Sequence, residues 1–203
     1  MRRALAVVTV IGVVVALAGW SSRAQIAKPI AVDDREMYAV YASLLQREWI
    51  VRVAKATNLV VQEETATNWG CMPSGKPMET DWKPVLDDFR SANAGSHVLL
   101  AGQELGLPYQ VVARATIAAS IDRPIPNGVS DGWQGFRRRF PDSGGFLQMS
   151  VVGFDSTRQR AMVYVAHSCG GLCGGGTHHL LERDGTRWRE AKVPDLVQCV
   201  WAS

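Results

Sequence analysis

The first 24 residues have the pattern of a secretory signal peptide, and this decides which part of the chain can belong to a folded domain. Arg2 and Arg3 form a short cationic start, residues 4–18 are an uninterrupted apolar run, and residues 22–24 have the small-x-small form of a cleavage site. Fifteen apolar residues are too few to span a bilayer comfortably. The sequence therefore predicts a leader cleaved after Ala24, and an uncleaved membrane anchor is the less favoured alternative.

Cleavage would also change the charge of the chain. The full sequence has 22 Lys and Arg against 19 Asp and Glu, which gives a formal net charge of +3. Residues 1–24 contain three arginines and no acid, so the mature chain, residues 25–203, is formally neutral. A neutral chain lacks the basic surface expected of a nucleic-acid-binding protein. The one basic run, residues 137–139, is more typical of a solvent-exposed helix face.

All four cysteines of the sequence lie in the mature part, at Cys71, Cys169, Cys173 and Cys199. An even number of cysteines in an exported chain favours disulfides. Three pairings are possible, and closeness in sequence favours Cys169–Cys173, which leaves Cys71 to pair with Cys199. The longer bridge would join the middle of the chain to its end, so we expect a single exported domain over residues 25–203.

Spacing and capping residues predict helices in the first two thirds of the mature chain. Asp33 and Asp34 precede apolar residues at helical spacing, which indicates an amphipathic helix. A second helix is expected from Pro84 to a stop at Gly95, and a short third one from Trp133 to Phe140. The apolar run Leu59-Val60-Val61 predicts a strand at residues 58–63, and a segment rich in Val, Tyr and Thr predicts another at residues 109–117.

The last sixty or so residues contain the clearest structural signal. Four strand-like runs, residues 145–154, 161–168, 177–183 and 187–193, are separated by short segments rich in turn residues. Short connections require antiparallel neighbours, because parallel strands need a long crossover. The predicted fold class is therefore α+β, with N-terminal and central helices packed on a C-terminal antiparallel β-meander.

Short motifs mark this C-terminal block: SxVGF at residues 150–154, AxVYV at 161–165, CGxLCG at 169–174, Trp188, and WxS at 201–203. With them the chain resembles an uncharacterised family of small exported bacterial proteins, firmly over the last third and loosely over the middle. The resemblance implies a fold and an exported location, but no activity, cofactor or site residue. His178 and His179 stand where the family is expected to have an aromatic residue, so no family-wide role is assigned to them.

Several possible metal ligands lie within thirteen residues of the C-terminal block: His167, Cys169, Cys173, His178 and His179. Their spacing is not that of a zinc finger or ribbon. In a strand, neighbouring residues point to opposite faces, so only one of the two adjacent histidines could join such a site. A structural disulfide between the two cysteines is favoured, with a zinc site and a redox-active dithiol as alternatives. No cofactor is expected.

Residues 128–132 match the G-x-S-x-G pattern of a catalytic serine, with Ser130 at its centre. That chemistry requires a strand that leads directly into the serine and a base within hydrogen-bond reach. Here a loop containing Pro124 and Pro126 comes first. We therefore interpret Asp131 as a helix cap and assign no catalytic residue.

Seven tryptophans are many for 203 residues, and one of them leaves with the leader. Apolar neighbours place four others in the core: Trp82, Trp133, Trp188 and Trp201. Trp69 lies in a loop beside Cys71, where packing on the disulfide is favoured over exposure to a ligand.

These observations favour a disulfide-stabilised, non-catalytic binding or interaction protein, located in the periplasm or outside the cell. Its ligand is an unknown molecule of the envelope or the extracellular space, and neither nucleic acid nor, after cleavage, the membrane is an expected partner. The alternative is an exported hydrolase whose site is assembled only in three dimensions. A deep pocket that holds His167 or His178 near a hydroxyl or a carboxylate would favour that alternative.

Overall fold

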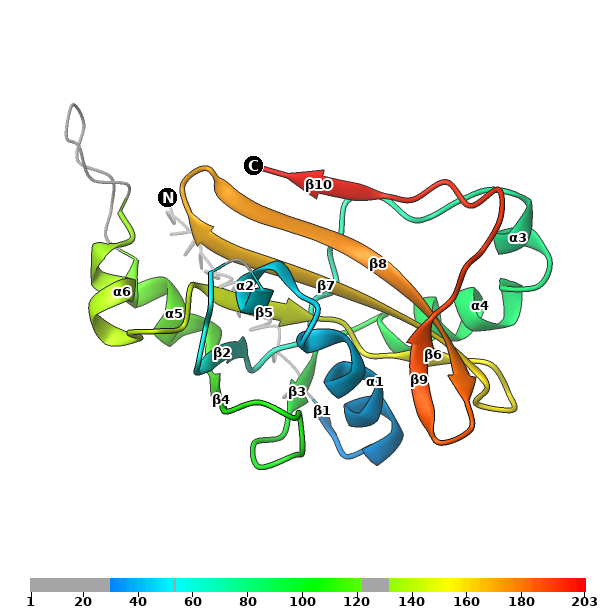
Figure 1. Cartoon of the computed structure of the whole chain (residues 1–203), viewed down its shortest axis with the longest axis horizontal. Coiled ribbons are helices and arrows are strands. Elements are labelled where there is room, and N and C mark those ends of the chain that lie inside the picture. The colour runs from blue at the N-terminus through cyan, green and yellow to red at the C-terminus, as the bar shows by residue number, and fades with distance from the viewer. Residues whose placement is uncertain (1–29, 53, 122–131) are drawn as a thin grey trace, which may run out of the picture.

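A mixed sheet of eight strands carries most of the fold (Figure 1). The structure is a computed structural model that describes residues 30–52, 54–121 and 132–203. Six strands are hydrogen-bonded in the order β10-β8-β7-β5-β2-β4, while β6 pairs with β7 and β9 pairs with β8. The strands are β2 (Leu59–Gln62), β4 (Tyr109–Val112), β5 (Phe146–Met149), β6 (Gly153–Phe154), β7 (Arg160–Gly170), β8 (Cys173–Asp184), β9 (Arg187–Glu190) and β10 (Val200–Ala202).

Two further strands, β1 (Ile30–Val32) and β3 (His97–Leu99), form a separate parallel pair. The helices described are α1 (Arg35–Leu45), α2 (Trp49–Arg52), α3 (Lys76–Glu79), α4 (Lys83–Ala92), α5 (Arg114–Ser120) and α6 (Gln134–Arg139). None of these described helices combines the length and the hydrophobicity that crossing a membrane would need. The fold is α+β, as the sequence predicts.

The C-terminal half of the sheet is the predicted antiparallel meander. Strand β7 pairs antiparallel with β5, β6 and β8, and β8 pairs antiparallel with β9 and β10. The other half is parallel, because β2 lies between β4 and β5 and runs in the same direction as both. The helix-containing stretches that separate these strands in sequence supply the long crossovers that parallel pairing requires.

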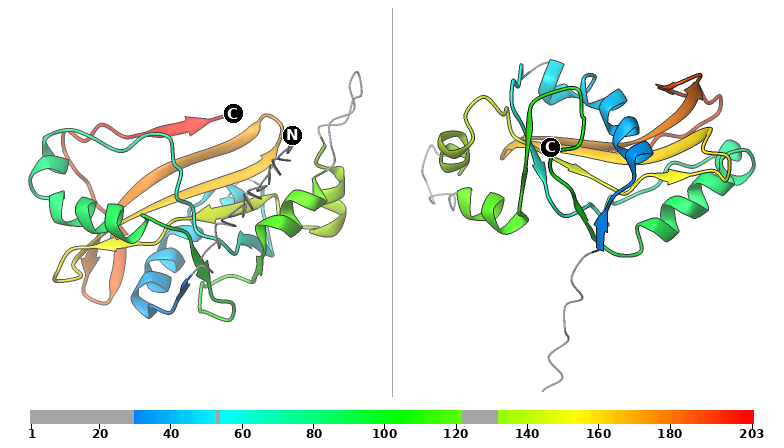
Figure 2. Two further views of the ribbon diagram at one scale, coloured as in Figure 1. Left: turned by 180° about the vertical axis from the view of Figure 1, so that it is seen from behind. Right: turned by 90° about the horizontal axis from the view of Figure 1, so that it is seen from below.

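Helices cover both faces of the sheet (Figure 2). On one side, here called the α1 face, α1 buries Met37, Val40, Tyr41 and Leu44 against a large apolar cluster. This helix begins as predicted, because the Asp34 carboxylate accepts hydrogen bonds from the backbone N–H groups at the helix start.

The opposite side, here called the α4 face, carries two separate apolar clusters. Helix α4 covers one of them with Val85, Leu86 and Phe89 over β7 and β8. Helices α5 and α6 cover the other, over β2, β4 and β5. Phe89 is fully buried and lies directly over Gly153, where a Cβ atom would fall on the helix backbone. None of the described helices lies over the sheet between the two clusters.

The strand predicted at residues 109–117 is wrong beyond Val112, where α5 begins instead. No side chain caps this helix locally. Its first backbone N–H, that of Arg114, is bound by the carboxylate of Glu64, fifty residues earlier in the chain. An anion at a helix N-terminus is stabilising, and a cap from so far away leaves no local pattern in the sequence.

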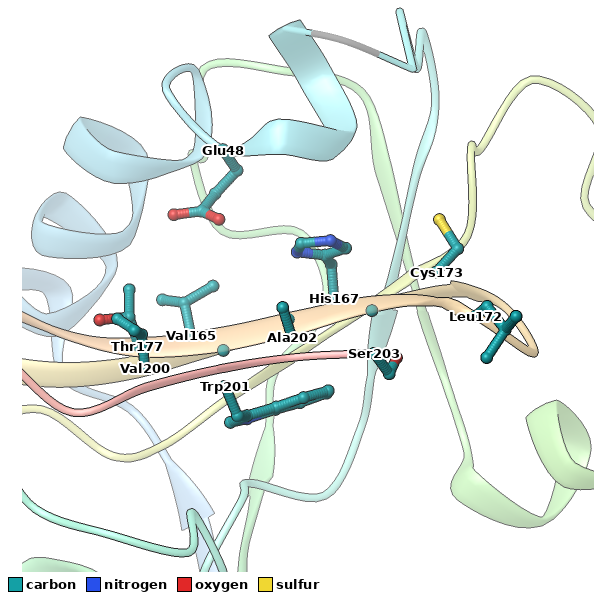
Figure 3. Close-up of a pocket in the computed structure, with 13 residues that line it drawn as sticks. Glu48, Val165, His167, Leu172, Cys173, Thr177, Val200, Trp201, Ala202 and Ser203 are labelled. Carbon is teal, nitrogen blue, oxygen red and sulfur yellow. The ribbon is translucent and has the colours of Figure 1, made fainter.

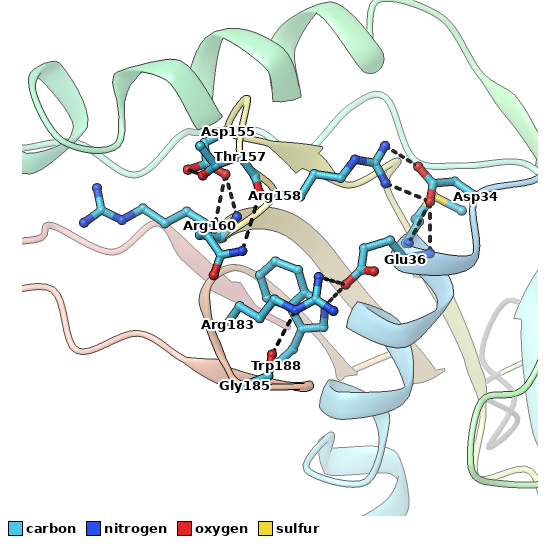
Figure 4. A network of polar contacts seen from close by, with 11 residues as sticks. Asp34, Glu36, Asp155, Thr157, Arg158, Arg160, Arg183, Gly185 and Trp188 are labelled. Atoms are coloured by element: carbon cyan, nitrogen blue, oxygen red, sulfur yellow. Dashed lines mark hydrogen bonds and ion pairs between the residues drawn. The ribbon is translucent and has the colours of Figure 1, made fainter.

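A polar network fixes the start of α1 to the far end of the meander (Figure 4). Arg158 binds Asp34 through two nitrogens, at 3.0 and 2.7 Å, and these bonds lower the pKa of the Asp34 carboxyl below its ordinary value. Trp188 is buried, as predicted, and donates its ring N–H to Glu36 at 2.6 Å. The same carboxylate pairs with Arg183 at 3.2 Å.

Some predictions fall on parts of the chain that are not described. The leader at residues 1–24 is one, and the segment that contains Ser130 and Asp131 is another. The position before α6 is occupied by Trp133, which makes no side-chain cap bond. The basic run at residues 137–139 lies on an exposed helix face, in agreement with the sequence analysis.

Candidate functional site

The uncovered part of the α4 face is a cleft of about 470 Å³. It lies between the cluster under α4 and the start of α5, and it is bordered by the segment at residues 64–71 and by β10. Its lining combines aromatic rings with uncharged polar groups: Gln62, Thr65, Thr67, Asn68, Trp69, Ser96, Gln148, Tyr164 and Trp201. A concave surface of this composition is typical of a small-molecule site.

Two glutamines form the floor of the cleft. Gln62 on β2 is buried, with 5% of its surface exposed, and its amide donates to the carbonyl of Glu64 at 2.9 Å. Gln148 on β5 donates to the Gln62 side-chain oxygen at 3.1 Å. The side-chain oxygen of Gln148 accepts no hydrogen bond from the described residues. One amide therefore orients the other, and an acceptor is left at the floor.

Three aromatic side chains form one wall. Trp69 packs on Phe89 and Tyr164, with ring centroids 4.9 and 6.2 Å apart, respectively. Trp201 donates its ring N–H to the Tyr164 hydroxyl at 2.6 Å. Within the described part of the chain, the proton of that hydroxyl has no acceptor. Tyr164 therefore links the two tryptophans and leaves a donor available.

The Cys71–Cys199 pair holds this wall together. The two cysteines lie at disulfide-bonding distance, with Cα atoms 5.8 Å apart, within the usual range for such bridges. Trp69 stands two residues before one cysteine, and Trp201 stands two residues after the other. A single bridge therefore brings together two aromatic segments that are far apart in the sequence.

A glycine makes room for the tryptophan of the edge strand. Gly176 on β8 lies opposite Trp201 on β10, and a Cβ atom there would meet both the Tyr164 hydroxyl and the Trp201 ring nitrogen. The prediction that Trp201 belongs to the core is wrong, since 39% of its surface is exposed. Its ring lies over the glycine-rich end of β8, next to the edge of the sheet, and none of the described helices covers it.

The rim of the cleft carries one negative and one positive side chain. One carboxylate oxygen of Glu64 binds the start of α5, and the other accepts no hydrogen bond from the residues described. The exposed Arg114 guanidinium lies on the same rim. The part of the lining that the structure describes therefore has no net formal charge.

A second hollow, of about 460 Å³, lies on the α1 face at the glycine-rich end of β7 and β8. Figure 3 shows the His167 ring and the Glu48 carboxylate on the same side of the strands, with the Trp201 ring on the other side. Burial lowers the pKa of His167, although the charge of Glu48 opposes this effect. This hollow brings a histidine near a carboxylate, as the hydrolase alternative requires.

The proposed zinc ligands do not converge. Cys169 and Cys173 lie at disulfide-bonding distance, with Cα atoms 5.1 Å apart. His178 and His179 point to opposite faces of β8, as predicted: the first packs against aromatic rings on the α4 face, and the second contacts Glu48 and Glu190. Among the described residues, no group of three His, Cys, Asp or Glu side chains is placed to hold a metal ion.

The two adjacent histidines have opposite protonation behaviour. His178 is buried, and its ring nitrogens have no hydrogen-bond partner in the described structure. Burial, together with the neighbouring charge of His179, lowers the pKa of His178 to about 4. Burial also opposes the charged form of His179, but the bonds to Glu190 at 2.8 Å and Glu48 at 3.3 Å outweigh it and raise the pKa to about 9.

We expect the fold to become less stable at alkaline pH, where the His179 contacts are lost. The pKa of His179 is about 9 in the folded protein and about 6.5 in the unfolded chain. The contribution of the charged ring to the free energy of unfolding is therefore complete below pH 6.5 and is lost as the pH rises through 9. Between pH 6.5 and pH 9.5, urea unfolding should show that the free energy of unfolding falls by roughly 3 kcal/mol more in the wild type than in His179→Gln. Equal losses in both proteins would contradict this assignment.

Comparison of the chain with protein families, with curated proteins and with solved structures gives no match. The candidate site therefore rests on its own geometry. The sequence indicates Trp69 and Trp201 separately, without a sign that they share a site, and no motif in it marks Gln62, Gln148 or Tyr164. Only the alternation of residues along β2, β5 and β7 could have indicated that these three side chains share one face.

Proposed function

We propose that this chain is an exported protein, processed after Ala24, that binds a ligand in the cleft on the α4 face without changing it chemically. The observation that carries the proposal is the pairing of two aromatic segments by Cys71–Cys199 over a floor of oriented amides. Such pairing supports a site with a fixed shape. Two cysteine pairs at bonding distance also fit an oxidising compartment.

A ligand screen tests the proposal. The mature protein is mixed with oligosaccharides, short peptides, nucleosides and fatty acids, thermal unfolding reports binding, and mass spectrometry reports the state of each compound afterwards. We expect one class of compound to raise the unfolding temperature of the wild type but not that of Trp201→Ala. Mass spectrometry should show that this compound is recovered unchanged. Stabilisation that is equal in both proteins, or no stabilisation by any class, would contradict the proposal. Native material whose mass still includes Met1 would contradict processing after Ala24.

The hydrolase alternative is favoured by one observation, the proximity of His167 and Glu48 in the hollow on the α1 face. A histidine beside a carboxylate can act as a general base toward water. Of the hydroxyl groups that line this hollow, that of Ser203 lies with Trp201 on the far side of the strand. Turnover of an ester, peptide or glycoside that is abolished in His167→Ala would establish this alternative and would overturn non-catalytic binding.

A further inference from the structure

The aromatic and amide groups of the cleft point to a particular class of ligand. We infer that the cleft on the α4 face binds an uncharged saccharide, with a sugar ring stacked on the exposed face of Trp201 and its hydroxyl groups bound by Gln148, Tyr164 and Glu64. This inference rests on the proposed function, because it names the ligand of that same site. The observations that support it are the charge, the hydrogen-bonding capacity and the exposed apolar surface of the lining.

The charge of the lining fits a neutral ligand. Among the described residues that line the cleft, the charged side chains are those of Glu64 and Arg114, and their formal charges cancel. Phosphate-bearing ligands such as nucleotides are bound by clusters of Arg, Lys and backbone N–H groups, and the described residues of this lining include only one Arg and no Lys. A saccharide without acidic groups requires no compensating charge.

The hydrogen-bonding groups of the cleft include both donors and acceptors. The side-chain oxygen of Gln148 and the second carboxylate oxygen of Glu64 are acceptors with no partner among the described residues, whereas the Tyr164 hydroxyl has a proton to donate. A sugar hydroxyl is at once a donor and an acceptor, so neighbouring hydroxyls on one ring can satisfy such a mixed set. A purely apolar ligand would leave these groups unsatisfied, at a cost in binding free energy.

The aromatic wall supplies the other half of the recognition. A sugar ring presents C–H groups on its faces and hydroxyl groups at its edge, so it needs an apolar plane beside polar groups. Trp201 exposes 39% of its surface, and its ring N–H is already bound by Tyr164. Its orientation is therefore fixed before any ligand arrives, and the entropy cost of binding is lower for that reason.

Titration with four neutral trisaccharides tests the inference: maltotriose, cellotriose, mannotriose and tri-N-acetylchitotriose. Binding to the mature, oxidised protein is measured by calorimetry, with a short peptide and adenosine as probes of other classes. We expect at least one trisaccharide to bind, and its affinity to fall about tenfold or more in Trp201→Ala and in Gln148→Leu. We also expect the affinity to change less than about twofold between low and high salt, because the ligand carries no charge.

Leu172→Ala is the matched control. Leu172 is 91% exposed and lines the hollow on the α1 face but not the cleft, so its truncation should leave the affinity unchanged. Loss of trisaccharide binding in Leu172→Ala but not in Trp201→Ala would overturn the inference. If only the peptide or adenosine binds, and Trp201→Ala abolishes that binding, the saccharide inference fails but the proposed function stands. If no probe binds, both fail. Trp201→Phe, which keeps a ring at this position, should retain part of the affinity and separates lost stacking from misfolding.

Discussion

Replacing both Cys71 and Cys199 with alanine is expected to lower the free energy of unfolding by about 5 kcal/mol. The bridge closes a loop with a sequence separation of 128 residues, and in the chain-entropy model the stabilisation increases with the length of that loop. It also joins the segment that carries Trp69 to the edge strand that carries Trp201. The double variant should therefore lose ligand affinity as well as stability.

The second cysteine pair gives the matched control for this prediction. Cys169 and Cys173 are separated by four positions, so replacing both with alanine should cost about 2 kcal/mol. Urea unfolding of the two double variants under oxidising conditions measures the difference. Losses of equal size would show that the long bridge does not constrain the unfolded chain in the way proposed here.

Phe89→Ala is expected to lower the free energy of unfolding by about 4 kcal/mol, the second largest effect after loss of the Cys71–Cys199 bridge. The ring is fully buried beneath α4, where it contacts Trp69 and His178, with ring centroids 4.9 and 5.6 Å from its own. Removing it leaves a cavity under the aromatic wall, and Gly153 directly below has no side chain that could fill the space. The wall should therefore lose its support, and the affinity for a ligand of the cleft should fall as well.

Arg90→Ala tests whether the effect of Phe89→Ala comes from the core. Arg90 is the next residue of the same helix and is exposed, so its replacement should change the free energy of unfolding by less than about 0.5 kcal/mol. Chemical denaturation followed by circular dichroism measures both variants. A loss of less than about 1 kcal/mol in Phe89→Ala would mean that α4 does not depend on this contact.

Local patterns in the sequence were sufficient for α1, α4 and α6 and for the meander, but not for α2, α3 and α5. Asp34 predicts the start of α1, Pro84 lies in the first turn of α4, and the alternation along β8 places His178 and His179 on opposite faces. Each of these features depends on neighbours within a few residues. The antiparallel pairing of β7 and β8 could be predicted for the same reason, since a short turn connects the two strands.

Features that depend on long-range contacts could not be predicted from local patterns in the sequence. The cap that starts α5 comes from Glu64, and the parallel pairing of β2 joins segments separated by intervening helices. Trp201 was assigned to the core on its apolar neighbourhood, but it lies on an edge strand whose exposure depends on the whole sheet. The candidate cleft also depends on long-range contacts, because Gln62 and Gln148 come together only when β2 and β5 pair.

The indole N–H groups of the tryptophans beside the Cys71–Cys199 bridge can show directly whether these residues form a binding site. Mature protein labelled with ¹⁵N is titrated with the trisaccharide that binds most tightly, and the indole resonances are followed by NMR. We predict that the resonances of Trp69 and Trp201 shift, while those of Trp133 and Trp188, which are buried in other clusters, stay in place. Shifts confined to Trp133 or Trp188, or none in Trp69 and Trp201 at saturation, would contradict it.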